Sequence, residues 1–178
     1  MTRRVLVAGI GNIFLGDDGF GVEVANRLAA RNMPDGVKVA DFGIRGVHLA
    51  YELLDGYDAV VLVDAMPMGD EPGTLAVLEP GPLPSPAAGD DVAPVVDAHS
   101  MNPGVVLGML AGLGGAVDRI VIVGCEPADL EEGIGLSHPV AEAVDRAVGL
   151  CEEVVSELLD RIGLESAGLE SAGKDNRP

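Results

Sequence analysis

The segment from Gly9 to Val24, GIGNIFLGDDGFGVEV, follows a short apolar run and precedes a helical pattern, and it constrains the fold more than any other part of the chain. This order of strand, loop and helix is typical of parallel α/β sheets, which bind ligands in the loops at the carboxyl ends of their strands. A dinucleotide-binding loop in this place would offer bare backbone N–H groups to phosphate. Asp17 and Asp18 stand there instead, and two carboxylates repel a pyrophosphate. The segment therefore favours a cation over a nucleotide.

Apolar runs and helical patterns alternate along the rest of the chain. We predict strands at 5–8, 37–42, 59–63, 74–78 and 119–123, and helices at 20–31, 47–54, 101–113 and from a cap at Ser137 to about 162. The continuous run at 59–63 predicts the central strand, and 74–78 predicts an antiparallel edge strand. This alternation is typical of one three-layer α/β domain, with a mostly parallel twisted sheet of about five strands and helices on both faces.

Two segments depart from the pattern. Residues 79–94 contain five prolines and predict a long loop, which in a compact domain is usually functional or mobile. The tail repeats GLESA and carries few apolar residues. We therefore expect a single α/β domain over residues 1–162, followed by a disordered tail over 163–178.

The composition restricts the class of partner. The formal net charge of −18 disfavours nucleic acids and anionic membranes, and fits either a basic partner protein or simply a soluble, salt-adapted surface. Cys125 and Cys151 form no CxxC pair, which indicates free thiols in a reducing compartment. Residues 98–117 lack charged side chains but contain five glycines, so we expect a core helix there and not a membrane span. We expect a cytoplasmic monomer.

Three side chains stand at strand ends or beside a loop. Asp18 follows the first strand, Asp64 ends the third, and His99 follows the proline-rich segment. Two carboxylates and an imidazole suit a divalent metal such as nickel or zinc and leave coordination positions open. Asp41, at the end of the second strand, adds a fourth acidic group. Each of these residues, and Asp17, could instead cap a helix or turn, and spacing alone does not decide between the two interpretations.

Several segments together resemble the hydrogenase maturation proteases, the endopeptidases that trim the large-subunit precursor of nickel–iron hydrogenases. The first is GIGNIFLGDDGFGVEV. The others, in chain order, are DFGIRGVHLAYELL, VVLVDAM, PGT, DAHSMNP and VGCEPADLEEGIGLS, followed by the final helix. The resemblance covers about residues 4–160 without a large gap.

The resemblance implies a twisted sheet between helices and a site that binds nickel, or a substitute divalent ion, through Asp18, Asp64 and His99. It also implies an aspartic-type peptidase, with Asp18, Asp64 and Asp41 as candidate catalytic residues. The first ligand is often glutamate in the family, and Asp18 is shorter. Many members have Gly-Gly-Thr after the residue matching Asp41, where this chain has residues 42–44, Phe-Gly-Ile. Arg45 is either a contact for an acidic group of the substrate or an ordinary surface residue.

We therefore expect a cytoplasmic endopeptidase that removes the C-terminal extension of a hydrogenase large-subunit precursor and recognises the nickel that the precursor carries. One alternative is a nickel-dependent chaperone on the same fold that binds the precursor without cutting it. A related protease with another precursor is a second alternative. A flavodoxin-like nucleotide module conflicts with the Asp17 and Asp18 loop. Cys125 follows a strand, but no histidine is clearly placed to activate it as a nucleophile.

Overall fold

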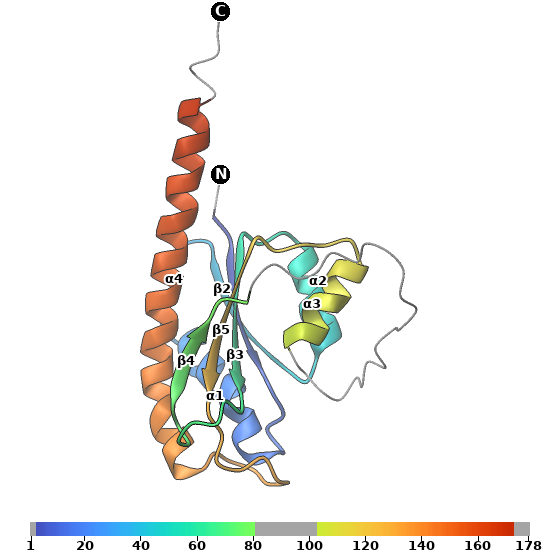
Figure 1. Cartoon of the computed structure of the whole chain (residues 1–178), viewed down its shortest axis with the longest axis vertical. Helices are drawn as coiled ribbons and strands as arrows, with labels where there is room; N and C mark the ends of the chain where they lie inside the picture. The colour runs from blue at the N-terminus through green and yellow to red at the C-terminus, as the bar shows by residue number, and fades with distance from the viewer. Residues whose placement is uncertain (1–2, 81–102, 173–178) are drawn as a thin grey trace, which may run out of the picture.

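A five-stranded sheet in the order β2-β1-β3-β5-β4 forms the centre of the computed structural model, which describes residues 3–80 and 103–172, with side chains as far as Glu165 (Figure 1). The elements are β1 (Val5–Ile10), η1 (Gly16–Gly19), α1 (Phe20–Ala29), β2 (Val37–Gly43), α2 (Gly46–Leu54), β3 (Ala59–Ala65), β4 (Leu75–Leu78), α3 (Pro103–Gly112), β5 (Arg119–Cys125) and α4 (His138–Ala172). The neighbours among β1, β2, β3 and β5 pair in parallel, and β4 runs antiparallel beside β5 at the edge. The predicted fold class, central strand and antiparallel edge strand are confirmed.

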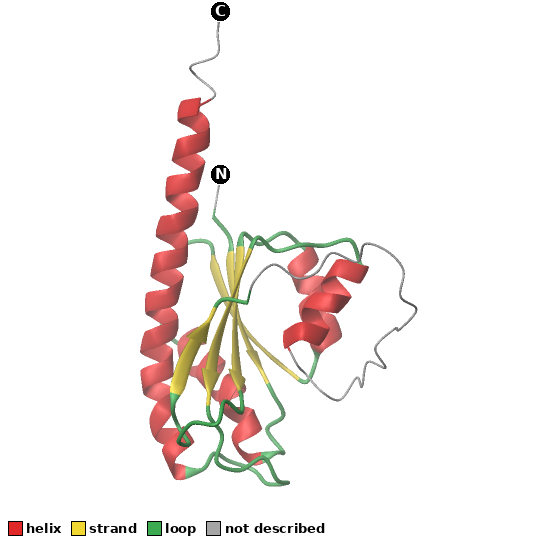
Figure 2. Cartoon of the chain, in the orientation of Figure 1, coloured by secondary structure: helices red, strands yellow, loops and turns green. Residues whose placement is uncertain are grey.

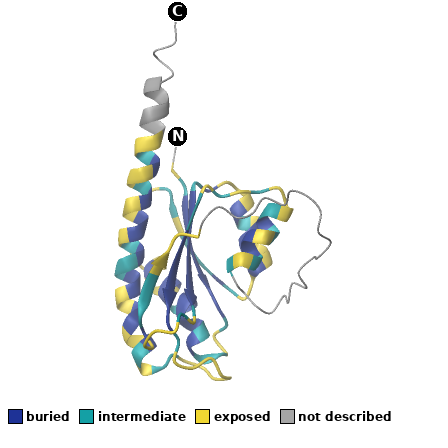
Figure 3. Cartoon of the chain, in the orientation of Figure 1, coloured by how far each residue is buried: buried dark blue, intermediate teal, exposed yellow. Residues whose placement is uncertain are grey.

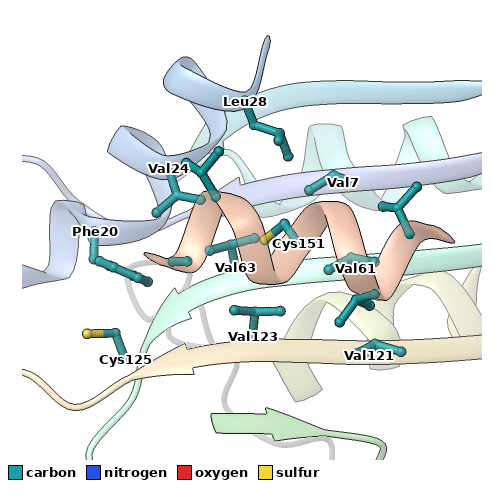
Figure 4. Close-up of a cluster of buried hydrophobic side chains, with 14 of the residues drawn as sticks. Val7, Phe20, Val24, Leu28, Val61, Val63, Val121, Val123, Cys125 and Cys151 are labelled. Carbon is teal, nitrogen blue, oxygen red and sulfur yellow. The ribbon is translucent and has the colours of Figure 1, made fainter. Parts of the chain in front are cut away.

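Alternate residues of the strands face two separate helical layers. One face packs Val7, Val61 and Val123 against α1 and α4, and the other packs Leu6, Leu62 and Ile122 against α2 and α3. Figure 4 shows the first of these clusters, with side chains of α1 and α4 meeting the strands. Every residue of β3 is buried, because this strand has a neighbour on each side and helices on both faces. The apolar run at 59–63 is the sequence signal of that position.

Two glycines allow α1 to lie against the strands that it follows. A Cβ at Gly21 would lie 2.1 Å from the carbonyl oxygen of Val63 and 2.4 Å from that of Ile10. A Cβ at Gly9 would lie 2.2 Å from the carbonyl oxygen of Gly21. Since no side chain fits at these distances, both positions need glycine for packing and not for an unusual backbone angle. The close approach places the first turn of α1 directly over β1 and β3.

The elements extend beyond some predicted ends. β1, β3 and β5 each run two residues further, so Asp64 lies within β3 and not after it. The predicted end of the last helix at Ile162, with a disordered tail after it, differs from the structure, where α4 continues to Ala172. Alanine, leucine and glutamate in this stretch favour the helix, and no proline stops it. Residues 173–178 lie outside the described part.

Some predictions fall on residues that are not described. These are most of the proline-rich loop, the first two residues of the helix predicted at 101–113, and His99. Among the residues that are described, no helix has the length and apolar character needed to cross a membrane.

Candidate active site at the carboxyl edge of the sheet

The loops that follow the parallel strands gather at one edge of the sheet, at the lower end of the view in Figure 2. The loop after β1 and the loop after β5 are joined there by backbone hydrogen bonds. The N–H of Gly16 donates to the carbonyl of Gly133 (3.0 Å), and the N–H of Gly133 donates to the carbonyl of Phe14 (2.9 Å). This edge is where parallel α/β sheets place ligands. Asp17, Asp18 and Asp64 all belong to it.

Asp18 and Asp64 interact electrostatically at this edge, while their predicted roles as ligands and catalytic groups stay predictions. Asp18 lies in η1, and its Oδ2 accepts a hydrogen bond of 2.6 Å from the N–H of Asn12, which fixes the carboxylate against the first loop. Asp64 lies near the end of β3 and is only 7% exposed. Burial, and after it the negative charge of Asp18, raise the pKa of Asp64 to about 8 against a hydrogen bond from the Ala65 N–H, which acts to lower it. Binding a proton or a cation reduces the charge repulsion between two neighbouring carboxylates of this kind.

Asp17 has a structural role. Its side chain is fully buried, and its carboxylate accepts hydrogen bonds from the N–H groups of Ala128 (2.8 Å), Asp129 (3.0 Å) and Ser137 (2.6 Å) and from the Ser137 hydroxyl (2.8 Å). Burial acts to raise the pKa of Asp17, but these hydrogen bonds together outweigh it and lower the pKa below 3.8. Asp17 therefore clamps the loop after β5 to the loop after β1 and has no free oxygen to share with Asp18.

Asp41 lies at the carboxyl end of β2, opposite Gly9 in the strand register. The N–H of Gly11 donates to the carbonyl of Gly43, so the ends of β1 and β2 adjoin. The buried Oδ1 of Asp41 has no hydrogen-bond partner among the described residues. Asp41 itself is one of the residues that line an open groove of about 550 Å³ between β2 and α2, together with His48 and Tyr51. Among the described residues no hydrogen bond joins Asp41 to Asp18 or Asp64, so a shared catalytic role for the three stays a prediction.

Arg45 supports the turn between β2 and α2. Its Nε donates to the carbonyl of Phe42 (3.0 Å) and its Nη2 donates to the carbonyl of Asp41 (2.5 Å). Two of the N–H donors of the guanidinium are therefore used to hold the backbone beside Asp41. The surface-residue interpretation of Arg45 has a structural basis, and a contact with substrate would have to use the remaining N–H groups.

His99, the third predicted ligand, lies outside the described residues. Within residues 3–80 and 103–172, no three histidine, cysteine, aspartate or glutamate side chains converge as a metal site. The described part of the chain thus contributes the carboxylate pair Asp18 and Asp64, and the complete set with His99 stays a prediction.

Two residues at the end of β5, Cys125 and Glu126, have roles that differ from a catalytic one. Cys125 is fully buried among apolar side chains (Figure 4), and this burial raises the pKa of its thiol to about 11. A thiol of that kind is a poor nucleophile. Glu126 is buried and accepts hydrogen bonds from the N–H groups of Met68 (2.5 Å) and Asp70 (3.2 Å), which holds the loop after β3. The role of Glu126 was not predicted, although an acidic residue directly after a buried strand is a sequence signal of one.

Comparison with known proteins decides the family. The model of the hydrogenase maturation protease family matches residues 22–154, which include Asp41, Asp64 and His99. The chain belongs to the hydrogenase maturation protease family. It is 32% identical to the hydrogenase expression/formation protein HupD of Bradyrhizobium diazoefficiens, over 94% of this chain and 85% of HupD.

Solved structures of hydrogenase maturation proteases share the fold. The hydrogenase maturating endopeptidase HybD from Escherichia coli is 28% identical and matches with a TM-score of 0.65, over 89% of this chain and 93% of HybD. A hydrogenase 2 maturation peptidase from a Thaumarchaeota archaeon is 31% identical and has a TM-score of 0.64, over 86% of this chain and 99% of the peptidase. The matches cover nearly all of each of these proteins.

Proposed function

We propose that this protein is an endopeptidase of the cytoplasm that removes the C-terminal extension of a nickel–iron hydrogenase large-subunit precursor, and that it recognises the nickel already bound in that precursor. Family membership supports the reaction class. The observation that carries the proposed site is the pairing of Asp18 with the buried Asp64 at the carboxyl edge of the sheet. A cation brought by the substrate would relieve the charge repulsion that a proton otherwise relieves.

The chemistry of the pair fits this role. The raised pKa of Asp64, about 8, means that the carboxyl group is largely protonated at neutral pH before substrate arrives. Nickel in the precursor would displace that proton and bind the carboxylates of Asp18 and Asp64 together with His99. Carboxylate and imidazole ligands suit such a divalent ion, and three of them leave room for the precursor's own ligands. The metal is then part of the substrate and aligns the precursor on the protease.

Hydrolysis requires a water and a proton acceptor beside the peptide bond. The water oxygen bonds to the carbonyl carbon while its proton passes to a carboxylate, and the C–N bond then breaks as the amine takes up a proton. Asp18, Asp64 and Asp41 are the candidate acceptors, as expected for an aspartic-type enzyme. Holding the peptide bond at a fixed position relative to these groups can lower the activation barrier by on the order of 7–11 kcal/mol in well-oriented systems.

The test uses a precursor loaded with nickel and a gel-shift assay for its shortening. Asp64→Asn keeps the side-chain shape and removes the charge, so we expect the variant to fold, to bind the loaded precursor more weakly and to leave it uncut. Asp160→Asn, on the exposed side of α4, is the matched control and should cut normally. Normal cutting by folded Asp64→Asn would refute the site. Binding without cutting by the wild type would instead favour the chaperone interpretation.

A second measurement addresses the third ligand. Calorimetric titration of Ni²⁺ or Zn²⁺ into the wild type and into His99→Ala should show a weak site that the substitution weakens further. Equal affinities in the two proteins would remove His99 from the ligand set.

A further inference from the structure

Four large apolar side chains are exposed on the two loops that border the Asp18 and Asp64 pair. Ile13 and Phe14 follow β1 and are 48% and 60% exposed. Leu130 and Ile134 follow β5 and are 42% and 83% exposed. The same loops lie at the lower end of the view in Figure 3, where exposed residues gather. We call these four apolar side chains the apolar rim. Glu131 and Glu132, which are also exposed, lie beside it.

The rim is held rigidly. The two loops are joined through Phe14, Gly16 and Gly133 by backbone hydrogen bonds, and the N–H of Asp17 donates to the carbonyl of Asp129 (2.9 Å). The buried Asp17 carboxylate adds its hydrogen bonds to Ala128, Asp129 and Ser137. Apolar side chains on a fixed backbone lose little conformational entropy when a partner covers them, so they are suited to act as binding anchors.

The charge of these loops selects the partner. Residues 11–19 and 126–137 contain acidic side chains and no lysine or arginine. Glu131 and Glu132 form no ion pair within the described part of the chain. A second copy of this chain, with the same acidic loops and a net charge of −18, would be repelled, and so would an anionic membrane. A protein surface with apolar side chains among lysines or arginines is complementary on both counts.

We propose that the apolar rim is the docking surface for the precursor, and that it binds a segment of apolar side chains flanked by basic residues next to the processed site. This inference rests on the proposed function, because the rim borders the candidate active site. Docking would occur before cleavage and outside the carboxylate pair. Loss of the rim should therefore weaken binding of the precursor and leave the catalytic step intact.

The first experiment measures binding and processing of the nickel-loaded precursor. Phe14→Ser with Ile134→Ser should raise Kd and KM by about tenfold or more, with kcat and the melting temperature unchanged. Leu164→Ser, 75% exposed on α4, is the control for loss of an exposed apolar side chain and should change none of these. If the wild type cuts the precursor and the double variant has the same KM, the docking surface is refuted and the proposed function still stands.

The second experiment separates charge from apolar contact. Glu131→Gln with Glu132→Gln should slow association with the precursor several-fold at roughly 0.05 M NaCl. The difference from the wild type should decrease as the salt is raised and should be absent at roughly 0.5 M NaCl. Glu153→Gln with Glu157→Gln, on the exposed face of α4, is the matched pair and should leave the association rate unchanged. An equal effect of the two pairs would show only the general acidity of the protein and would overturn the assignment of the rim.

A third arm does not depend on the precursor. A short synthetic peptide of leucines flanked by lysines is titrated against a peptide with glutamates in place of the lysines, and methyl NMR shifts are followed. The lysine peptide should bind and shift the methyl groups of Ile13, Leu130 and Ile134. Shifts confined to other surfaces, or equal binding of the two peptides, would overturn the inference even if the wild type proved unable to cut any precursor.

Discussion

Replacement of Asp17 by asparagine tests the clamp between the two loops at the carboxyl edge. One carboxylate oxygen of Asp17 accepts three hydrogen bonds, from the N–H groups of Ala128 and Asp129 and from the Ser137 hydroxyl, and the other accepts the Ser137 N–H. An amide has only one oxygen. The best orientation keeps this oxygen toward the three donors and turns the NH₂ group against the Ser137 N–H, where two donors meet.

The size of the effect follows from this geometry. One buried hydrogen bond is lost, at a cost of about 1–3 kcal/mol, and the three that remain lose about 1 kcal/mol each because the acceptor is no longer charged. The substitution also removes the cost of burying the charge of Asp17, which offsets part of the loss. We therefore expect Asp17→Asn to lower the free energy of unfolding by about 2–4 kcal/mol.

Urea denaturation of Asp17→Asn and Asp18→Asn gives a matched comparison of two adjacent carboxylates. Asp18 accepts one hydrogen bond, from Asn12, which an asparagine can also accept, so we expect a change within about 1 kcal/mol for Asp18→Asn. Because the folded-state pKa of Asp17 lies below 3.8, its stabilising contribution is present above that pH and is lost as the pH falls through the folded value. The gap between wild type and Asp17→Asn should therefore close in acid. A free energy of unfolding for Asp17→Asn within about 0.5 kcal/mol of wild type at pH 7 would refute the clamp.

Further predictions concern stability and packing. The pKa of Asp64 is raised from 3.8 to about 8, so its protonated form favours the folded state at low pH, and this contribution is lost as the pH rises toward 8. In thermal melts over that pH range, the stability of Asp64→Asn relative to the wild type should increase by at least about 1 kcal/mol. Parallel pH profiles of the two proteins would contradict this. Gly21→Ala places a Cβ 2.1 Å from a carbonyl oxygen and should cost about 3 kcal/mol or more, whereas Gly149→Ala in α4, with open space around its Cβ, should be neutral or stabilising by up to about 1 kcal/mol; equal denaturation midpoints would exclude the packing argument. Deletion of residues 163–178 removes the exposed ion pair of Glu165 with Arg119 and should lower the melting temperature only slightly with processing intact, while a drop of several degrees would show that the tail docks.

The sheet could be predicted from the sequence because its signals are local. The apolar run at 59–63 requires burial on both faces, and a central parallel strand provides it. The run at 75–78, after Pro72 and Gly73, is also apolar but only four residues long, and it becomes the antiparallel edge, where its residues are half-buried or exposed. The end of the last helix was less predictable, because residues after Ile162 keep helix propensity while they lose the apolar period. Packing and propensity give different boundaries there, and propensity prevails.

The division of work between Asp17 and Asp18 could not be predicted from the sequence. Both are acidic residues of one turn, and either could cap a helix or bind a ligand. Their roles depend on which side of the turn faces the loop after β5, and the partners of Asp17 lie more than 110 residues away along the chain. Only the folded chain shows that Asp17 is enclosed by Ala128, Asp129 and Ser137.

The burial of Asp17 also bears on the role proposed for Asp18. When Asp18 and Asp64 are both ionised, their charges repel each other. The pair can bind a cation only if the loop that carries Asp18 stays in place beside Asp64. The Asp17 hydrogen bonds hold that loop to residues 128–137, and the Asn12 N–H orients Asp18 within it. The hydrogen bonds of Asp17 thus keep Asp18 beside Asp64, whose pKa is raised first by burial and second by the charge of Asp18. Because the same hydrogen bonds fix the apolar rim, one buried side chain sets the geometry both of the proposed catalytic pair and of the surface that would bring the precursor to it.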